Sequence, residues 1–270
     1  MLQKTKETAG FLKNKIGKDI RTAIILGSGL GNLAEQMTQK TEIPYTEIPN
    51  FPVSTVAGHG GKLIIGKLGN TDILAMQGRF HFYEGYDMQT VTFPVRVFRM
   101  MGIENLVLSN AAGGMNPNFS IGDIMLIKDH INLFPEHPLR GRNIDELGER
   151  FPDMSEAYCK EWLDIARNIA KENNIKVQEG VYVGTQGPTY ETPSEYRYFR
   201  IIGGDAVGMS TVPEVIVARH AGMRCFAVSI ITDLGVDGKI VEVTHEEVQV
   251  IAAAAEPKMT LIIKELIGRI

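Results

Sequence analysis

Short apolar runs alternate with longer stretches of helical period along the whole chain, and this alternation constrains the fold more than any other feature. The runs TAIIL (22–26), NLVLS (105–109) and CFAVSII (225–231) are almost continuously apolar, which is typical of strands buried on both faces of a sheet. Helical patterns separate them, and no sequence repeat or linker intervenes. Because such alternation produces a sheet covered by helices, we expect an α/β fold with residues 1–270 in one domain.

Local patterns predict the remaining elements. KLIIG (62–66) and TDILAM (71–76) flank Gly69-Asn70, a turn pair that favours a hairpin. We further expect helices over 5–17, 88–101 and 156–173, a helix after residue 31, strands over 123–127 and 181–185, and a long functional loop or subunit contact over 129–155. Three helix starts carry an N-cap threonine with a glutamate three residues on: Thr192 with Glu195, Thr211 with Glu214, and Thr244 with Glu247.

Charge and composition exclude several classes of protein. The net charge is -4 and the pI about 5.9, so we expect no nucleic-acid partner. No apolar run is long enough for a membrane span, and the first twenty residues lack the apolar core of a signal peptide. The two cysteines, Cys159 and Cys225, match no metal or redox spacing. These features predict a cytoplasmic protein without a membrane contact or a bound metal.

The segment GSGLG (27–31) follows a predicted strand and precedes a predicted helix. Glycines let backbone N–H groups approach a phosphate, and Ser28 adds a hydroxyl donor. However, Asn32 stands where a dinucleotide-binding loop requires its third glycine, and the Lys-Ser/Thr pair of a P-loop is absent. An ordinary tight turn explains this segment as well as an anion site does.

Four further segments carry donors or small residues that suit an anion. In QGRFHFYEGY (77–86), Arg79 and His81 share a face if the segment is extended, and the mixture of charged and aromatic residues is hard to explain by core packing, although a solvated surface strand is the alternative. GHGG (58–61) presents His59 on a loop and is more simply an incidental turn. SNAAGG (109–114) allows close approach of a ligand after a strand, or forms a tight turn. In GMST (208–211), two hydroxyls lie at a predicted helix start.

Taken together, these segments resemble the trimeric class of purine nucleoside phosphorylases. The matching motifs, in family order, are ILGSGLG (25–31), GHGG (58–61), QGRFHFYEGY (77–86), SNAAGG (109–114), ERFPDMS (149–155), GPTYETPSE (187–195), DAVGMSTVPE (205–214) and THEEV (244–248). The resemblance implies a central mixed sheet, partly barrel-like and flanked by helices. It also implies phosphate-dependent cleavage of purine nucleosides in purine salvage, a homotrimer, and inorganic phosphate as co-substrate without a cofactor.

The resemblance also assigns roles to residues of this chain. It implies that phosphate is held by Ser28, His59, Arg79, His81, Ala111 and Ser210. It implies ribose contacts from Tyr83, Met209 and His245, and a base contact from Glu191 with Tyr190 beside it. Phe80 and Val207 would line the pocket less specifically, and Phe151 would close the site of a neighbouring subunit. The residues expected to carry the chemistry are His81, Glu191, Asp233 and His245.

Phosphorolysis at C1′ passes through a sugar with cationic character while the purine leaves with negative charge. Phosphate held by Arg79 and His81 would stabilise the sugar, and the Glu191 carboxylate would accept N1–H of the base. Asp233 departs from the pattern, since many relatives that prefer 6-oxopurines carry Asn there. An ionised Asp only accepts hydrogen bonds, which suits a 6-amino group, whereas a protonated one donates. We expect inosine and guanosine to be the preferred substrates, because adenine has no N1–H that Glu191 could accept.

Other activities compete with this interpretation. A methylthioadenosine or adenosine-directed phosphorylase is the close alternative, favoured by Asp233 and opposed by His245 and Glu191. A non-catalytic nucleoside- or phosphate-binding protein would bind without turnover. A nucleotide-dependent dehydrogenase is suggested by the glycine segment alone, and its spacing fails at Asn32.

Overall fold

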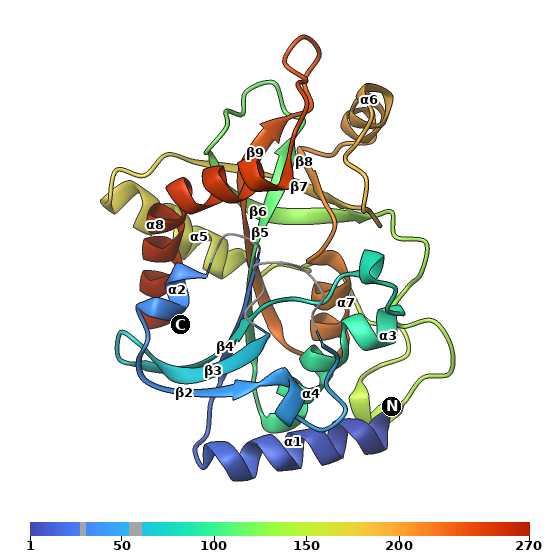
Figure 1. Ribbon diagram of the computed structural model, residues 1–270, viewed down its shortest axis with the longest axis vertical. Helices are drawn as coiled ribbons and strands as arrows, with labels where there is room; N and C mark the ends of the chain where they lie inside the picture. The colour runs from blue at the N-terminus through green and yellow to red at the C-terminus, as the bar shows by residue number, and fades with distance from the viewer. Residues whose placement is uncertain (28–30, 54–60) are drawn as a thin grey trace.

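The computed structural model describes residues 1–27, 31–53 and 61–270, and within them it shows a mixed α/β fold (Figure 1). The strands of this part of the chain form one sheet in the order β2-β3-β4-β1-β5-β8-β7-β6-β9. The last strand pairs back with β5, so the second half of the sheet closes on itself. The expected mixed, partly barrel-like sheet flanked by helices is therefore confirmed.

The closed part of the sheet contains β5 (Asn105–Gly114), β6 (Ile124–Asn132), β7 (Val177–Gly184), β8 (Ala206–Gly208) and β9 (Arg224–Leu234). The open part contains β1 (Thr22–Leu26), β2 (Thr38–Pro44), β3 (Lys62–Leu68) and β4 (Thr71–Gln77). The predicted hairpin joins β3 to β4, with Leu68 opposite Thr71 and Gly69 at φ 63° in the turn. Strands β4, β1, β5 and β9 run parallel, so their carboxyl ends meet at one edge of the fold.

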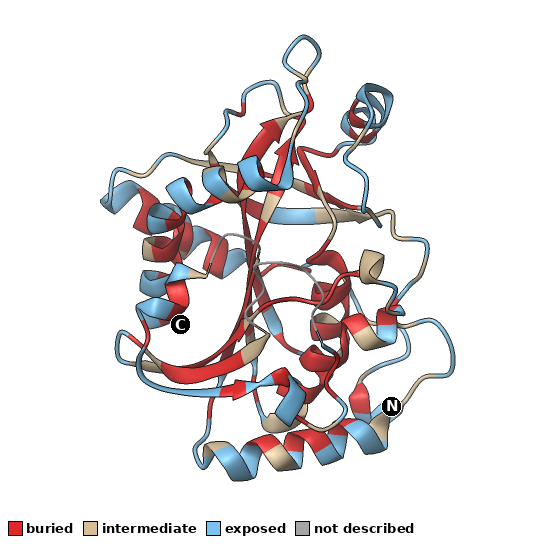
Figure 2. Ribbon diagram, viewed as in Figure 1, coloured by how far each residue is buried: buried red, intermediate tan, exposed pale blue. Residues whose placement is uncertain are grey.

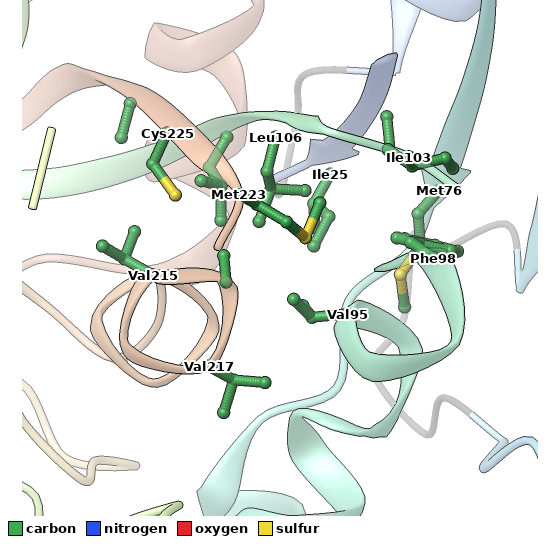
Figure 3. Packing of buried hydrophobic residues seen from close by; sticks show 14 of the residues in the cluster. Ile25, Met76, Val95, Phe98, Ile103, Leu106, Val215, Val217, Met223 and Cys225 are labelled. Carbon is green, nitrogen blue, oxygen red and sulfur yellow. The ribbon is translucent and has the colours of Figure 1, made fainter. Parts of the chain in front are cut away.

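Helices cover both faces of the sheet and explain why its central strands, such as β1, are apolar throughout. The helices α5 (Lys160–Glu172) and α8 (His245–Arg269) pack on the cluster that contains Ile24 and Leu26 of β1. The helices α1 (Leu2–Ile16), α4 (Phe93–Met101) and α7 (Val212–His220) pack on the cluster that contains Ile25. Successive strand residues point to opposite faces, so all five residues of β1 are buried. Figure 2 shows the central strands buried between partly exposed helices, and Figure 3 shows Ile25 and Leu106 facing Val95, Phe98 and Val215 from α4 and α7.

The short elements and helix ends follow local chemistry. They are α2 (Asn32–Glu35), α3 (Met88–Val91), α6 (Pro193–Ile201), η1 (Tyr45–Glu47), η2 (Phe82–Glu84) and η3 (Asp145–Leu147). The predicted capping boxes before α6 and α8 are confirmed: the Glu195 N–H donates to Thr192 Oγ1 and the Glu247 N–H donates to Thr244 Oγ1, both at 3.2 Å. Among the described helices, none is both long and apolar enough to cross a membrane.

Several expectations are wrong in detail, for identifiable reasons. The helix expected over 88–101 is broken at Thr92, because the ring of Pro94 clashes with a preceding turn and Pro supplies no N–H. The helix expected from 156 begins at Lys160. The segment 110–114, for which a tight turn was one of two alternatives, extends β5, and 129–132, expected as the start of a loop, extends β6. No strand was expected at β2, which is mostly exposed, or at β8, which has three residues.

Candidate active site

One cavity lies where the parallel strands end, and most of the predicted site residues line it. They come from the segment after β4, from β5, β8 and β9, from the loop before α6, and from the first residue of α8. The predicted residues that line it are Arg79, His81, Tyr83, Ala111, Tyr190, Glu191, Val207, Met209, Ser210, Asp233 and His245. Residues distributed over 79–245 of the chain thus converge on one concave site.

Arg79 is held rigidly at this site by hydrogen bonds that include contacts with Glu214, Ser109 and Ser210. Its Nε donates to Glu214 Oε1 at 2.6 Å, and its Nη1 donates to the Ser109 carbonyl at 3.0 Å and to Ser210 Oγ at 3.1 Å. Arg79 and Glu214 are 2% and 3% exposed. A buried guanidinium fixed in this way is preorganised to meet an anion that enters the cavity.

His81 reaches the cavity two residues beyond Arg79. Its backbone N–H donates to Glu84 Oε1 at 2.7 Å, and its Nδ1 lies 3.2 Å from the same oxygen. The imidazole stacks on Tyr83, with the ring centroids 4.7 Å apart. Burial lowers the pKa of His81, and the Glu84 carboxylate opposes this shift. If His81 is neutral and donates from Nδ1 to Glu84, its Nε2 is an acceptor for a protonated phosphate oxygen.

The SNAAGG segment is strand rather than turn, and this changes what each residue does. Asn110 bridges two elements: its side-chain amide donates to Thr211 Oγ1 at 2.8 Å and its carbonyl oxygen accepts from Ser229 Oγ at 2.7 Å. Ala111 and Gly113 line the cavity. A Cβ at Gly27 would lie 2.7 Å from the Ser109 carbonyl oxygen, so only a glycine at position 27 permits this close approach to β5.

The third predicted capping box, that of Thr211 with Glu214, does not form. The Thr211 side chain does not cap α7; it accepts from Asn110 and lies 3.2 Å from Ser210 Oγ, while Glu214 pairs with Arg79. Thr211 has φ 71°, a strained conformation for a β-branched residue. The long-range polar contacts override the local capping pattern and place Ser210 against the Arg79 guanidinium at the start of α7.

Two carboxyl groups, those of Glu191 and Asp233, line the same cavity. The pKa of Glu191 is raised to about 7, mainly by burial and in smaller part by the charge of Asp233. Burial also raises the pKa of Asp233, while hydrogen bonds from Tyr196 and Thr232 lower it. Titratable groups perturbed by burial within a cavity are typical of a functional site.

Two predicted residues stand apart from this cavity, and two more lie outside the described residues. Phe151 is 84% exposed and lies against Arg150, with the guanidinium carbon 5.3 Å from its ring. Phe80 packs in the core against Tyr45 and Phe51 rather than lining the cavity. His245, which does line it, begins α8 and lies 3.0 Å from the Gln249 side chain. Ser28 and His59 belong to the segments that the structure does not describe.

Sequence reasoning missed the residues that hold Arg79, Asp233 and the start of α2 in place. Glu214 balances Arg79, and Tyr196 donates to Asp233 at 2.9 Å. Glu256 of α8 accepts hydrogen bonds from the Asn32 side-chain amide and from the Leu33 N–H. This contact explains why position 32 carries asparagine rather than the third glycine of a dinucleotide-binding loop. The one signal that the sequence offers for Glu214 and Glu256 is an acidic residue among the apolar residues of a helical stretch.

Comparisons with known proteins agree with this geometry. The family model described as "Phosphorylase superfamily" matches residues 21–268. The chain belongs to this family. Purine nucleoside phosphorylase 1 of Geobacillus stearothermophilus is 53% identical over 90% of this chain and 89% of that protein. Purine nucleoside phosphorylase of Bos taurus is 49% identical over 98% of this chain and 94% of that protein.

Solved structures carry the same relationship. The purine nucleoside phosphorylase of Schistosoma mansoni in complex with adenosine has a TM-score of 0.94 and 41% identity, covering 99% of this chain and 97% of that one. A schistosoma purine nucleoside phosphorylase in complex with hypoxanthine has a TM-score of 0.93, with the same coverage. Within the phosphorylase superfamily, this chain therefore falls in the purine nucleoside phosphorylase family.

Proposed function

We propose that this chain catalyses the phosphate-dependent cleavage of purine ribo- and deoxyribonucleosides to free base and sugar 1-phosphate, with inosine and guanosine as its first substrates. The observation that carries the proposal is one cavity lined both by a rigid buried cation, Arg79, and by two carboxyl groups, Glu191 and Asp233. A cation suits the attacking phosphate, and a carboxyl suits the N1–H edge of the departing purine.

In the proposed reaction, phosphate is held by Arg79, Ser210 and His81, with backbone donors along 110–113 beside them. Ser28 and His59 are proposed as further phosphate ligands. The held phosphate faces C1′ of the sugar, so its negative charge stabilises the cationic sugar as the glycosidic bond breaks. Phosphate then bonds to C1′ directly, and no covalent enzyme intermediate or cofactor is needed.

The nucleoside is proposed to lie along the remaining lining residues. Tyr83, Met209 and His245 contact the ribose, with His245 near its 5′-hydroxyl, while Tyr190 and Val207 border the base. Ionised Glu191 accepts N1–H of hypoxanthine or guanine as negative charge builds on the ring. A methylthioadenosine phosphorylase needs an apolar pocket at the 5′ end, so the position of His245 on the cavity wall argues against that alternative.

We further propose that the protein is a cytoplasmic homotrimer in which Phe151 completes the neighbouring site. Phe151 is a large apolar side chain, 84% exposed, beyond the cavity of its own chain. The trimer itself rests on the resemblance to the family, and an exposed phenylalanine at this position is accessible to a neighbouring subunit.

Phosphorolysis of inosine, guanosine, adenosine and 5′-methylthioadenosine, measured side by side with and without phosphate, tests the proposal. We expect phosphate-dependent release of hypoxanthine and guanine as the fastest reactions. Release of base only from methylthioadenosine would move the chain to the alternative activity. Binding of nucleoside by folded protein without any turnover would support a binding protein instead.

A further inference from the structure

Tyr196 of α6 makes a buried contact with the candidate base-binding residue Asp233. Its hydroxyl donates to Asp233 Oδ2 at 2.9 Å, and Thr232 Oγ1 lies 3.1 Å from Asp233 Oδ1. Tyr196 is 4% exposed, and the hydrogen bond links residues that are 37 positions apart. Both oxygens of the Asp233 carboxyl are therefore held by hydroxyl groups.

Two glycines make room for this contact. A Cβ at Gly235 would lie 2.1 to 2.5 Å from atoms of the Tyr196 ring. A Cβ at Gly113 would lie 2.9 Å from Asp233 Oδ2 and 3.2 Å from the Tyr196 hydroxyl. Since atoms do not approach so closely, a side chain at either position would displace Tyr196 or Asp233. Glycine at positions 113 and 235 therefore allows the Tyr196 hydroxyl to reach the Asp233 carboxyl.

The groups around Asp233 form one electrostatic unit. Tyr196 comes from α6, Glu191 and Tyr190 from the loop before it, and His245 from the start of α8; all but Tyr196 line the cavity together with Asp233. Burial raises the pKa of Tyr196 far above its ordinary value, followed by the charges of Asp233 and Glu191. Because the Tyr196 hydroxyl stays protonated, it can donate to a carboxylate throughout the neutral range.

We propose that Tyr196 is a positioning residue: it holds Asp233 in the same cavity as Glu191, so that the two carboxyl groups bind a single proton between them. The inference rests on the proposed function and specifies its substrate class. Two carboxyl groups in one buried site do not both ionise readily, and the proton belongs to the pair rather than to either member. The site then has two forms of equal charge.

The two forms match the two common purine edges. A 6-oxopurine presents an N1–H donor and an O6 acceptor, which fit ionised Glu191 and protonated Asp233. A 6-aminopurine presents an N1 acceptor and an amino donor, which fit protonated Glu191 and ionised Asp233. A site with one mobile proton therefore accepts both inosine and adenosine without moving a side chain.

The hydroxyl of Tyr196 sets the balance between these forms. Its hydrogen bond stabilises ionised Asp233, which is the form that suits a 6-amino group. Without this donor, Asp233 takes the proton and the site favours 6-oxopurines. We expect Tyr196→Phe to lower the ratio of kcat/KM for adenosine to kcat/KM for inosine about tenfold, the effect of one hydrogen bond to a charged group.

The pH dependence of this ratio separates a shared proton from independent titration. In the wild type we expect a ratio that is flat between pH 5.5 and 8, since both forms carry the same charge. If Glu191 titrated alone, the ratio would fall about tenfold per pH unit, because adenosine would need its protonated form and inosine its ionised form. Phosphate ionisation affects both substrates equally and cancels in the ratio.

The experiment compares the wild type with the single variants Tyr196→Phe and Tyr198→Phe. It also compares Asp233→Asn with the double variant Asp233→Asn/Tyr196→Phe. Tyr198 is the matched control: it lies on the same helix and is 53% exposed. An asparagine carries no proton to share, so removing the Tyr196 hydroxyl should no longer change the ratio in that background. Thermal unfolding of each variant verifies that it is folded.

The outcomes distinguish the inference from the proposed function. The inference is supported if Tyr196→Phe lowers the adenosine-to-inosine ratio of kcat/KM about tenfold and the same change has no effect on this ratio in Asp233→Asn. Four outcomes would overturn the inference but not the proposed function. In Tyr196→Phe these are an equal loss of kcat/KM for both substrates or an unchanged ratio. In the wild type they are a ratio that falls steeply with pH, or cleavage of inosine without cleavage of adenosine. Cleavage of neither substrate by folded wild type would overturn the proposed function itself.

Discussion

The Nε of Arg79 lies 2.6 Å from Oε1 of Glu214, and both side chains are almost completely buried. These residues are 135 positions apart, one after β4 and the other in the first turn of α7. The pair neutralises the guanidinium and fixes its direction, so that Nη1 faces Ser210. The proposed phosphate site therefore depends on a carboxylate behind it.

Replacing Glu214 by alanine should be strongly destabilising. The change leaves the Arg79 charge buried without its partner, which costs about 3–5 kcal/mol of unfolding free energy. Urea unfolding measures this loss. The double variant Arg79→Met/Glu214→Leu should regain most of the stability but none of the phosphorolysis, since it removes both charges. A Glu214→Ala protein as stable as the wild type would contradict the role given to this pair.

Glu191 should lower the stability of the unliganded protein as pH rises. Its pKa is raised to about 7 from an ordinary 4.5, so the folded state favours the protonated form. Stability from this residue is fully present below about pH 4.5 and is lost as pH rises to about 7, by about 3 kcal/mol. The Glu191→Gln variant should therefore gain stability over the wild type at pH 8 but not at pH 5.

Denaturant unfolding at both pH values measures this effect, with Glu242→Gln as the exposed control. The same Glu191→Gln variant should lose activity on inosine, because an amide does not accept N1–H as strongly as a carboxylate. An identical stability difference between wild type and Glu191→Gln at the two pH values would rule out the raised pKa.

Asn110 should control the phosphate site through Thr211. Removing its amide leaves Thr211 Oγ1 without this donor and frees a residue held at φ 71° to relax. We expect Asn110→Ala to lose about 2 kcal/mol of stability and to raise the KM for phosphate several-fold, because Ser210 moves with Thr211. The control is Ser229→Ala, which removes the donor on the other side of Asn110. An equal rise in phosphate KM in both variants would show that Thr211 is not the link.

Phe151 offers a test of a site shared between subunits. Phe151→Ala should raise the KM for nucleosides, and Arg79→Ala should abolish phosphorolysis. In oligomers refolded from an equal mixture, about a quarter of the sites would combine an intact cavity with an intact neighbouring Phe151, and phosphorolysis with the wild-type KM for nucleosides should reappear. Mixing Arg79→Ala with Ser210→Ala is the control, since both defects lie in the same cavity. No recovery in verified mixed oligomers would place Phe151 outside the site.

The sequence by itself determined the secondary structure wherever local chemistry is sufficient. Continuous apolar runs specify β1 and β9, the Gly69-Asn70 turn specifies a hairpin, and the Thr192 and Thr244 boxes specify helix starts, because each depends on neighbours within a few residues. The motif residues of the cavity were also found in the sequence, since their types and order follow the family. A lone strand of three residues, β8, has no such local signal.

Only the tertiary structure decided which partners support those residues. Thr211 has the spacing of a capping residue yet bonds Asn110, because buried polar groups must be satisfied by whatever the fold brings near them. Closure of β9 onto β5 joins the strand ends into one cavity. The contacts of Arg79 with Glu214 and of Tyr196 with Asp233 likewise exist only after folding, since pairing across such separations leaves no trace in local propensity.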